Sequence, residues 1–95
     1  FATFVGKLAA TREGDGTLLD HSMVLYGSAM GNANDHTHHP LPLTVLGGGS
    51  GQITKGGHHI ASQNLTPMAN LLLALAQKSG VQTEKFGLST EAMDI

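Results

Sequence analysis

The chain of 95 residues has no cysteine, which excludes disulfides and metal sites built from thiolates. Charged residues make up only 13% of the sequence, and the five basic residues are scattered along it. A protein that follows nucleic-acid phosphates needs clustered Lys and Arg, so we expect no nucleic-acid partner. No apolar run approaches the roughly 18 residues that a membrane-spanning helix needs, so we expect no transmembrane segment.

The composition also bears on how the chain is organised. The sequence opens at Phe1 without a Met and without an apolar leader, and its low charge accompanies 13 glycines and 40% apolar residues. These features favour a segment that is largely buried inside a larger fold. We therefore interpret residues 1–95 as part of a single domain of a longer protein, with the upstream part of that protein as its main partner.

Apolar patterning predicts the α/β fold class. Residues 1–9 carry apolar side chains at the spacing of an amphipathic helix, and residues 66–79 form the clearest second helix. Residues 23–26 and 43–46 are short apolar runs without alternation, as in strands buried on both faces of a parallel sheet. Residues 58–61 are a candidate third strand. This order indicates one layer of an α/β domain.

The second predicted helix has recognisable ends. Thr66 is a good N-cap residue, and Pro67 occupies the favoured first position of the helix. Lys78 falls in the last turn, and Gly80 suits the left-handed position that follows a helix. The apolar side chains between these ends leave little polar face, so we expect a helix that is buried on most of its circumference.

The most informative polar feature is a group of one acid and three histidines that precedes the second predicted strand: Asp35, His36, His38 and His39. Alternate side chains of an extended segment share a face, so His36 and His38 are expected to point the same way. Neutral imidazole is a good ligand for zinc, iron, copper or nickel. We predict a divalent metal site with His36 as a ligand and the other three as further candidates. The alternative is that all four are polar loop residues.

Other motifs are weaker. His58 and His59 are adjacent, so at most one of them could join a shared site from a strand, and a strand-edge pair is the simpler interpretation. His21, just before a strand, is interpreted as a hydrogen-bonded turn residue. The glycines at 47–51 do not complete a dinucleotide-binding pattern, because Thr54 stands at its last position, so no cofactor-binding loop is predicted.

Several short motifs occur in an order that resembles a known family. They are GDGTLLD at 14–20, MVLYGS at 23–28, NDH at 34–36, KGG at 55–57, TPMANL at 66–71 and FG at 86–87. Together they resemble the C-terminal part of a secreted bacterial family known as domain of unknown function fifteen-fifty-two, which is similar to the alkaline phosphatase and sulfatase superfamily. The resemblance covers most of residues 1–90. It implies a secreted or periplasmic protein and a C-terminal fragment of an alkaline-phosphatase-like sheet with flanking helices.

The resemblance also implies where a site would lie. Residues 23–28 match a superfamily strand that usually ends in an Asp-His metal pair, which Ala29 and Met30 replace here. Asp35 and His36 match the position of a later metal-binding histidine, and the nucleophile would lie upstream. Two functions follow. One is a metal-dependent hydrolase of phosphate or sulfate esters, in which the metal polarises the ester oxygen. The other is a non-catalytic envelope or secreted protein that keeps the fold without a full set of ligands.

Overall fold

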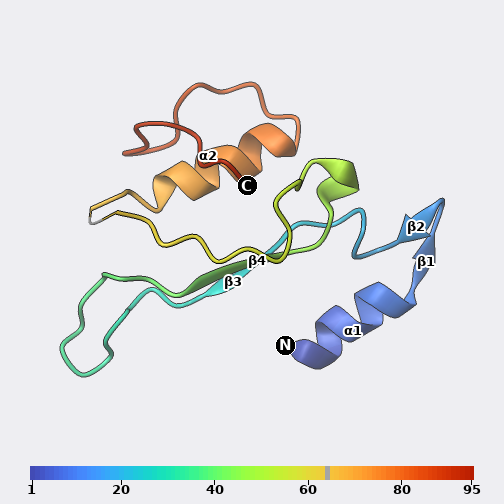
Figure 1. Cartoon of the computed structure of the whole chain (residues 1–95), viewed down its shortest axis with the longest axis horizontal. Helices are drawn as coiled ribbons and strands as arrows, with labels where there is room; N and C mark the ends of the chain where they lie inside the picture. The colour runs from blue at the N-terminus through green and yellow to red at the C-terminus, as the bar shows by residue number, and fades with distance from the viewer. Residues whose placement is uncertain (64) are drawn as a thin grey trace. The chain divides into compact units, whose positions relative to one another are not determined.

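The computed structural model describes residues 1–63 and 65–95 and divides the chain into two compact units, Phe1–Gly48 and Gly49–Ile95 (Figure 1). The described residues form two α-helices, one short 3₁₀ helix and two small antiparallel sheets. This composition confirms the mixed α/β class. Neither α-helix combines the length and the apolar character that crossing a bilayer demands. The interpretation of residues 1–95 as part of one larger domain stays a prediction.

The first unit begins with helix α1, Ala2–Ala10, as the apolar spacing predicts. The helix ends at Thr11, which has an extended backbone and whose hydroxyl donates a hydrogen bond to the Lys7 carbonyl at 2.7 Å. None of the helical residues is buried. The start of the helix is joined to the larger sheet by an aromatic contact, because the ring of Phe1 stacks on that of Tyr26 with centroids 4.1 Å apart.

A tight hairpin follows α1. Strand β1, Arg12–Glu13, pairs antiparallel with strand β2, Gly16–Thr17. Gly14 opens the turn with a φ of 56°, a left-handed conformation that costs glycine nothing because it has no side chain. The next turn is closed by the Asp20 carboxylate, which accepts hydrogen bonds from the N–H and the hydroxyl of Thr17 at 2.8 and 2.9 Å. These local bonds hold a hairpin that is too short to bury a core.

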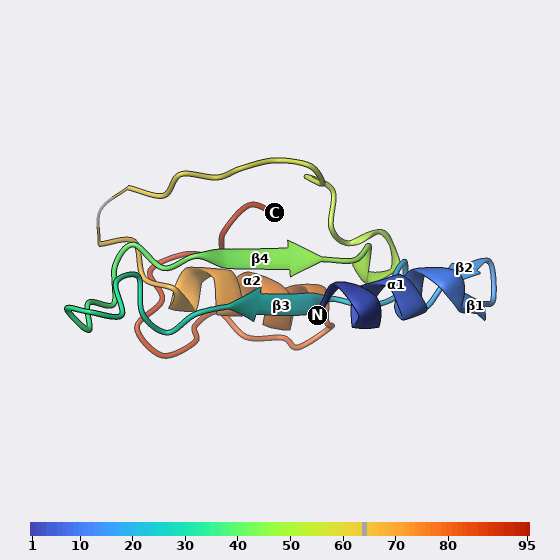
Figure 2. The ribbon, with the colours of Figure 1, turned by 90° about the horizontal axis from the view of Figure 1, so that it is seen from below.

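The larger sheet pairs strand β3, Val24–Gly27, with strand β4, Leu43–Leu46, and both lie within one residue of their predicted positions. Figure 2 shows the two strands side by side and pointing in opposite directions. The predicted parallel and fully buried arrangement is therefore wrong: the pair is antiparallel, and its residues are half-buried or exposed. The physical reason is the connection, because residues 28–42 fold back on themselves and reverse the chain, whereas a parallel pair needs a crossover.

The second unit starts with a short 3₁₀ helix, η1, Gly49–Gly51, and also contains helix α2, Ala69–Lys78. The predicted third strand at residues 58–61 is wrong. These residues are exposed, and no strand of the described chain pairs with them. A short apolar or aromatic segment forms a strand only when a neighbouring strand supplies partners for its backbone hydrogen bonds.

Helix α2 begins at Ala69, two residues after the predicted first position at Pro67. Pro67 and Met68 form a tight turn, in which their carbonyls accept hydrogen bonds of 3.0 Å from Asn70 and Leu71, each three residues ahead. No side chain caps the helix, so the predicted role of Thr66 as N-cap is wrong. The chain enters the helix through 3₁₀ bonds instead, which satisfy the first amide groups without a cap.

The C-terminal end of α2 confirms the left-handed conformation predicted for Gly80. Gly80 adopts a φ of 90° after the last turn. Its N–H donates to the Gln77 carbonyl, and the N–H of Val81 donates to the Ala76 carbonyl, both at 3.0 Å. This pair of bonds is the Schellman arrangement, which needs a left-handed residue at the position of Gly80.

The buried residues of the second unit gather around α2. The buried apolar side chains of the described chain are Leu71, Leu73, Ala74 and Ile95. Of the helical residues only Gln77 is exposed, which confirms a helix that is covered on most of its circumference. The C-terminal tail, residues 81–95, returns to this helix, where the N–H of Met93 donates to the Asn70 carbonyl at 3.0 Å. An ion pair between Lys55 and Asp94 ties the same tail to the segment before α2.

Candidate functional site

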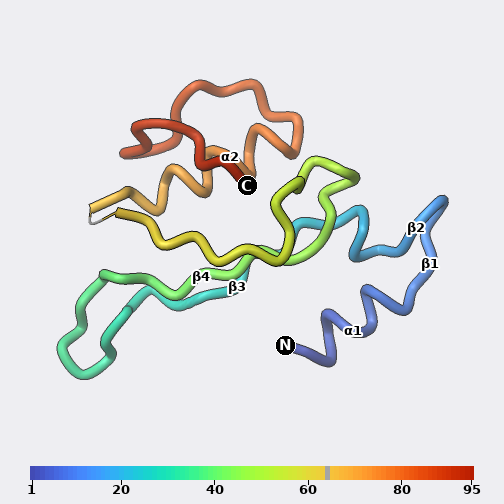
Figure 3. Tube along the Cα trace, in the orientation of Figure 1, coloured from blue at the N-terminus to red at the C-terminus, as the bar shows by residue number. Residues whose placement is uncertain are grey.

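The histidine group lies in the loop that joins β3 to β4, residues 28–42 (Figure 3). The two limbs of this loop are hydrogen-bonded to each other: the N–H of Ser28 donates to the Pro42 carbonyl at 3.2 Å, and that of Gly31 donates to the Thr37 carbonyl at 2.9 Å. A Cβ at Gly31 would overlap the Pro40 carbonyl oxygen, so a side chain is excluded at this point of closest approach. The loop is thus a folded extension of the hairpin.

The tip of the loop is closed by polar side chains. Asn32 and Thr37 form an isolated antiparallel bridge. The two carboxylate oxygens of Asp35 accept hydrogen bonds from the side-chain amides of Asn32 and Asn34, at 2.7 and 2.9 Å. Both oxygens of Asp35 therefore already have a donor, and the carboxylate acts as a brace for the turn. A metal would have to compete with these amides for the carboxylate.

His36 occupies the last position of this turn. Its φ is 51°, a left-handed conformation that few residues with a side chain adopt. The extended geometry predicted for residues 36–38 is therefore wrong, and the alternation that would place His36 and His38 on one face does not hold. The side chain of His36 is exposed. The sequence singled it out as the first ligand, but in the structure it is an exposed residue at the end of a turn.

His38 is the histidine that the loop orients. Its Nδ1 lies 2.9 Å from the carbonyl oxygen of Ala29, across the loop. A carbonyl oxygen only accepts hydrogen bonds, so Nδ1 carries the proton and donates it. In the neutral ring Nε2 then holds a free lone pair. Histidines that bind metals are commonly oriented in this way, by a hydrogen bond from the other ring nitrogen to a carbonyl or carboxylate.

The four predicted metal ligands do not form a closed site. Asp35, His36, His38 and His39 are all exposed. Over residues 1–63 and 65–95, no three His, Cys, Asp or Glu side chains come together in a way that could hold a metal ion. The arrangement offers one oriented imidazole with two more on the same loop, and a metal site here stays a prediction.

His58 and His59 lie in the second unit, on an exposed stretch outside any helix or strand. The interpretation of these two histidines as a strand-edge pair is therefore wrong. Without a regular backbone, the rule that adjacent side chains point to opposite faces does not apply to them.

A further cluster centres on His21, which lies in a hydrogen-bonded turn as the sequence predicts. Its Nδ1 is 2.9 Å from Glu13 Oε2, and its Nε2 is 3.1 Å from Asp15 Oδ1. The hydrogen bond with Glu13 raises the pKa of His21 above its usual value, with a smaller contribution from Asp15 and against the opposing effect of desolvation. Sequence reasoning missed the two acids, although they stand eight and six residues before the histidine across a recognisable Gly-Asp turn.

The side chain of Asp20 lies in the same turn. Its hydrogen bonds with Thr17 lower the pKa of the carboxyl group, and the nearby charges of His21 and Arg12 lower it further. Asp20 is bonded to Thr17 and not to the imidazole, so it braces the turn beside the cluster.

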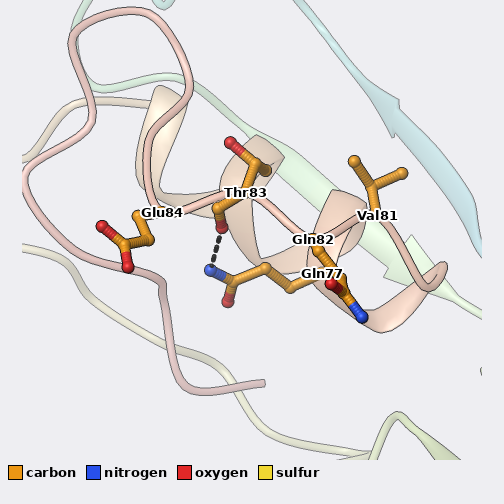
Figure 4. Close-up of a pocket in the computed structure, with 5 residues that line it drawn as sticks. All are labelled: Gln77, Val81, Gln82, Thr83 and Glu84. Carbon is orange, nitrogen blue, oxygen red and sulfur yellow. Dashed lines mark hydrogen bonds between the residues drawn. The ribbon is translucent and has the colours of Figure 1, made fainter.

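The second unit has an open pocket of about 460 Å³ just after α2, lined by Gln77, Val81, Gln82, Thr83 and Glu84 (Figure 4). Gln77 spans one side of it, because its side-chain amide donates to the Thr83 carbonyl at 2.8 Å. The lining contains one carboxylate and no cluster of titratable groups. This hollow therefore has the character of a surface depression beside the helix end and not of a reaction centre.

The β3–β4 loop is therefore the candidate site, on the strength of one oriented histidine and two more imidazoles beside it. Comparison with protein-family models, with curated proteins and with solved structures finds no match for this chain.

Proposed function

We propose that the loop of residues 28–42 supplies imidazole ligands to a divalent metal centre of an exported α/β protein that hydrolyses phosphate or sulfate esters. The observation that carries the proposal is the hydrogen bond from His38 Nδ1 to the Ala29 carbonyl oxygen at 2.9 Å. It leaves Nε2 as the free coordinating atom, in the orientation typical of metal-bound histidine. His38 is therefore the principal ligand of the proposal.

The neighbouring histidines are the next candidates. His36 stands two residues before His38 and His39 directly after it, and both side chains are exposed. Their imidazoles favour zinc, copper, nickel or iron over magnesium or calcium, which prefer oxygen ligands. Asp35 is a weaker ligand in this proposal, since both of its oxygens hold the amides of the tip.

The remaining ligands and the nucleophile belong, in this proposal, to the upstream part of a longer parent chain with an alkaline-phosphatase-like sheet. A bound metal ion would supply Lewis-acid polarisation of the ester oxygen and would lower the pKa of the attacking group. The chain's own contribution is to present His38 in one tautomer and to keep it in place. Gly31 supports this by letting the two limbs of the loop approach each other closely.

A non-catalytic envelope or secreted protein is the second candidate. Two observations favour it: no three potential ligands come together within residues 1–63 and 65–95, and the β3 strand is followed by Ala29 and Met30 where the resemblance implies an Asp-His pair. Neither side chain can bind a metal ion through nitrogen or a carboxylate oxygen. This alternative keeps the hairpin loop as a structural feature without a bound ion.

Elemental analysis of the native full-length protein tests the proposal, with His38→Ala and His36→Ala as variants. His58→Ala is the matched control, because His58 is an exposed histidine outside the loop. We expect a transition metal in the wild type and in the control. His38→Ala should contain less metal, because its metal affinity should fall by about tenfold or more. Equal metal content in all proteins would remove His38 from the site. No metal in the wild type would favour the non-catalytic alternative.

Hydrolysis of p-nitrophenyl phosphate and of p-nitrophenyl sulfate by the same proteins separates metal binding from catalysis. Activity that is lost with the metal in His38→Ala and kept in His58→Ala would support a hydrolase. A metal that binds through His38 without hydrolysis of either ester would limit the function to metal binding.

A further inference from the structure

We infer that His21 is a pH-sensitive clamp on the β1–β2 hairpin, whose charged ring joins Glu13 and Asp15 and whose neutral ring releases Asp15. The geometry is a single imidazole between two carboxylates, with Nδ1 at 2.9 Å from Glu13 Oε2 and Nε2 at 3.1 Å from Asp15 Oδ1. This clamp is independent of the proposed metal site.

The number of protons on the ring decides how many of these contacts can form. An ionised carboxylate only accepts hydrogen bonds, and a neutral imidazole has a single N–H to donate. Both contacts of His21 therefore require the doubly protonated, charged ring. The raised pKa of His21 has the same origin, because its largest cause is the hydrogen bond with Glu13 and the bond with Asp15 adds to it.

The two acids are not equivalent. Their difference determines which carboxylate loses its hydrogen bond when the ring of His21 becomes neutral. Glu13 belongs to strand β1, its side chain is 52% exposed, and it makes the shorter contact. Asp15 lies in the turn, its side chain is 95% exposed, and it makes the longer contact. A neutral ring that keeps its proton on Nδ1 retains Glu13. Its Nε2 lone pair then faces the Asp15 oxygen, and two acceptors repel each other.

The charge nearest to this cluster in the same turn is Asp20, which interacts electrostatically with His21. Asp20 is hydrogen-bonded to Thr17, and Arg12 acts on Asp20. The backbone N–H of His21 donates to the Thr17 carbonyl of strand β2 at 3.3 Å. His21 is thus anchored to β2 by its backbone while its side chain holds β1 and the turn, so the residue spans the whole hairpin.

The sign of the pH dependence follows from these contacts. A group whose pKa is raised by folding stabilises the folded state fully below its unfolded pKa of about 6.5, and this contribution is lost as the pH rises through the folded pKa. The clamp is therefore closed in mildly acidic solution and opens toward neutral and alkaline pH.

The test is an NMR titration of the isotopically labelled chain from about pH 5 to about pH 9, a range that contains the histidine transition. It follows the His21 ring and the carboxyl carbons of Glu13 and Asp15 in wild type, Glu13→Gln and Asp15→Asn. Glu91→Gln is the control, since it removes one negative charge from the other unit, Gly49–Ile95. Each of the three variants replaces an exposed carboxylate by its isosteric amide, which leaves the fold undisturbed.

We expect the midpoint of His21 to move to lower pH in Glu13→Gln and Asp15→Asn and to stay unchanged in Glu91→Gln. The carboxyl signal of Asp15 should shift with the midpoint of His21 in the wild type. The same His21 midpoint in all four proteins would overturn the inference, and so would an Asp15 signal that does not respond as the ring titrates.

Discussion

Asn70 on helix α2 and Thr90 in the C-terminal tail are joined by a two-way hydrogen bond. The Asn70 side-chain oxygen accepts from the Thr90 N–H at 2.9 Å, and its amide nitrogen donates to the Thr90 hydroxyl at 3.1 Å. Asn70 is only 2% exposed. A buried carboxamide whose donor and acceptor are both satisfied in this way fixes its partner strongly, because either half left unpaired would carry the full cost of desolvation.

Replacing Asn70 by Ala should destabilise the chain by about 1–3 kcal/mol, since two hydrogen bonds with Thr90 of about 0.5–1.5 kcal/mol each are lost. The free energy of unfolding from urea titration is the measurement. Gln82→Ala is the control, because Gln82 is an exposed amide in the same unit. Equal stability of both variants would contradict the role of Asn70 as the anchor of the tail.

Neighbouring leucines on α2 should differ in their contribution to stability. Leu73 is 1% exposed, whereas Leu72 is only half-buried. Leu73→Ala should cost about 2–5 kcal/mol, as for a fully packed leucine, and Leu72→Ala should cost less because its site borders on solvent. Urea unfolding of the two variants provides the comparison. A larger loss for Leu72→Ala than for Leu73→Ala would show that the burial of this helix has been assigned to the wrong face.

The sequence located the two α-helices and the two longer strands because their signals are local, whereas strands β1 and β2 were not predicted. The apolar spacing that predicted a helix at 1–9 is realised in α1, and Leu43–Leu46 is a strand at its predicted bounds. The pairing of the strands was not predictable from the same runs. An apolar segment without alternation contains no information on the direction of its neighbour, which depends on how residues 28–42 fold.

The position of the histidine group along the fold was predictable from the sequence, but its geometry was not. The sequence located the histidines on the connection between the two strands, where they are. It placed His36 and His38 on one face because an extended backbone was assumed, and the left-handed φ of 51° at His36 shows that the backbone is not extended there. The orienting partner of His38 is the backbone carbonyl of Ala29. Every residue has a main-chain carbonyl, so the residue type at position 29 does not reveal this contact, and it could not be inferred from the sequence.

Asp20 should make the stability of the chain depend on pH in the acidic range. Its pKa is lowered, first by the side-chain hydrogen bond with Thr17 and then by the bond with the Thr17 N–H. A carboxyl group whose pKa is lowered by folding contributes stability above its unfolded pKa of about 4, and this contribution is lost as the pH falls through the folded value. The wild type should therefore exceed Asp20→Asn in stability near neutral pH.

Thermal unfolding of both proteins at a series of pH values between about 2 and about 7 measures this difference, which should shrink below about pH 4. Glu91→Gln is the control for the loss of one acidic charge. A difference between wild type and Asp20→Asn that stays constant over the whole range would show that the Asp20 contacts do not depend on its ionisation.

Gly31 should be essential for the orientation of His38. A Cβ at position 31 would overlap the carbonyl oxygen of Pro40, so Gly31→Ala must push the two limbs of the loop apart. The limb that carries Ala29 then moves relative to the one that carries His38, and the hydrogen bond between them is lost. Gly56→Ala is the matched control, because a Cβ there would have no atom within 4 Å and no left-handed backbone to strain.

The nitrogen chemical shifts of the imidazole rings report this change directly, since they distinguish a proton on Nδ1 from one on Nε2. His38 should be fixed with the proton on Nδ1 in the wild type and in Gly56→Ala, and should exchange between both neutral forms in Gly31→Ala. The readout needs no metal, so it tests the geometry of the loop separately from the proposed function. A His38 that keeps its proton on Nδ1 in Gly31→Ala would show that the close approach of the two limbs is not what orients the ring.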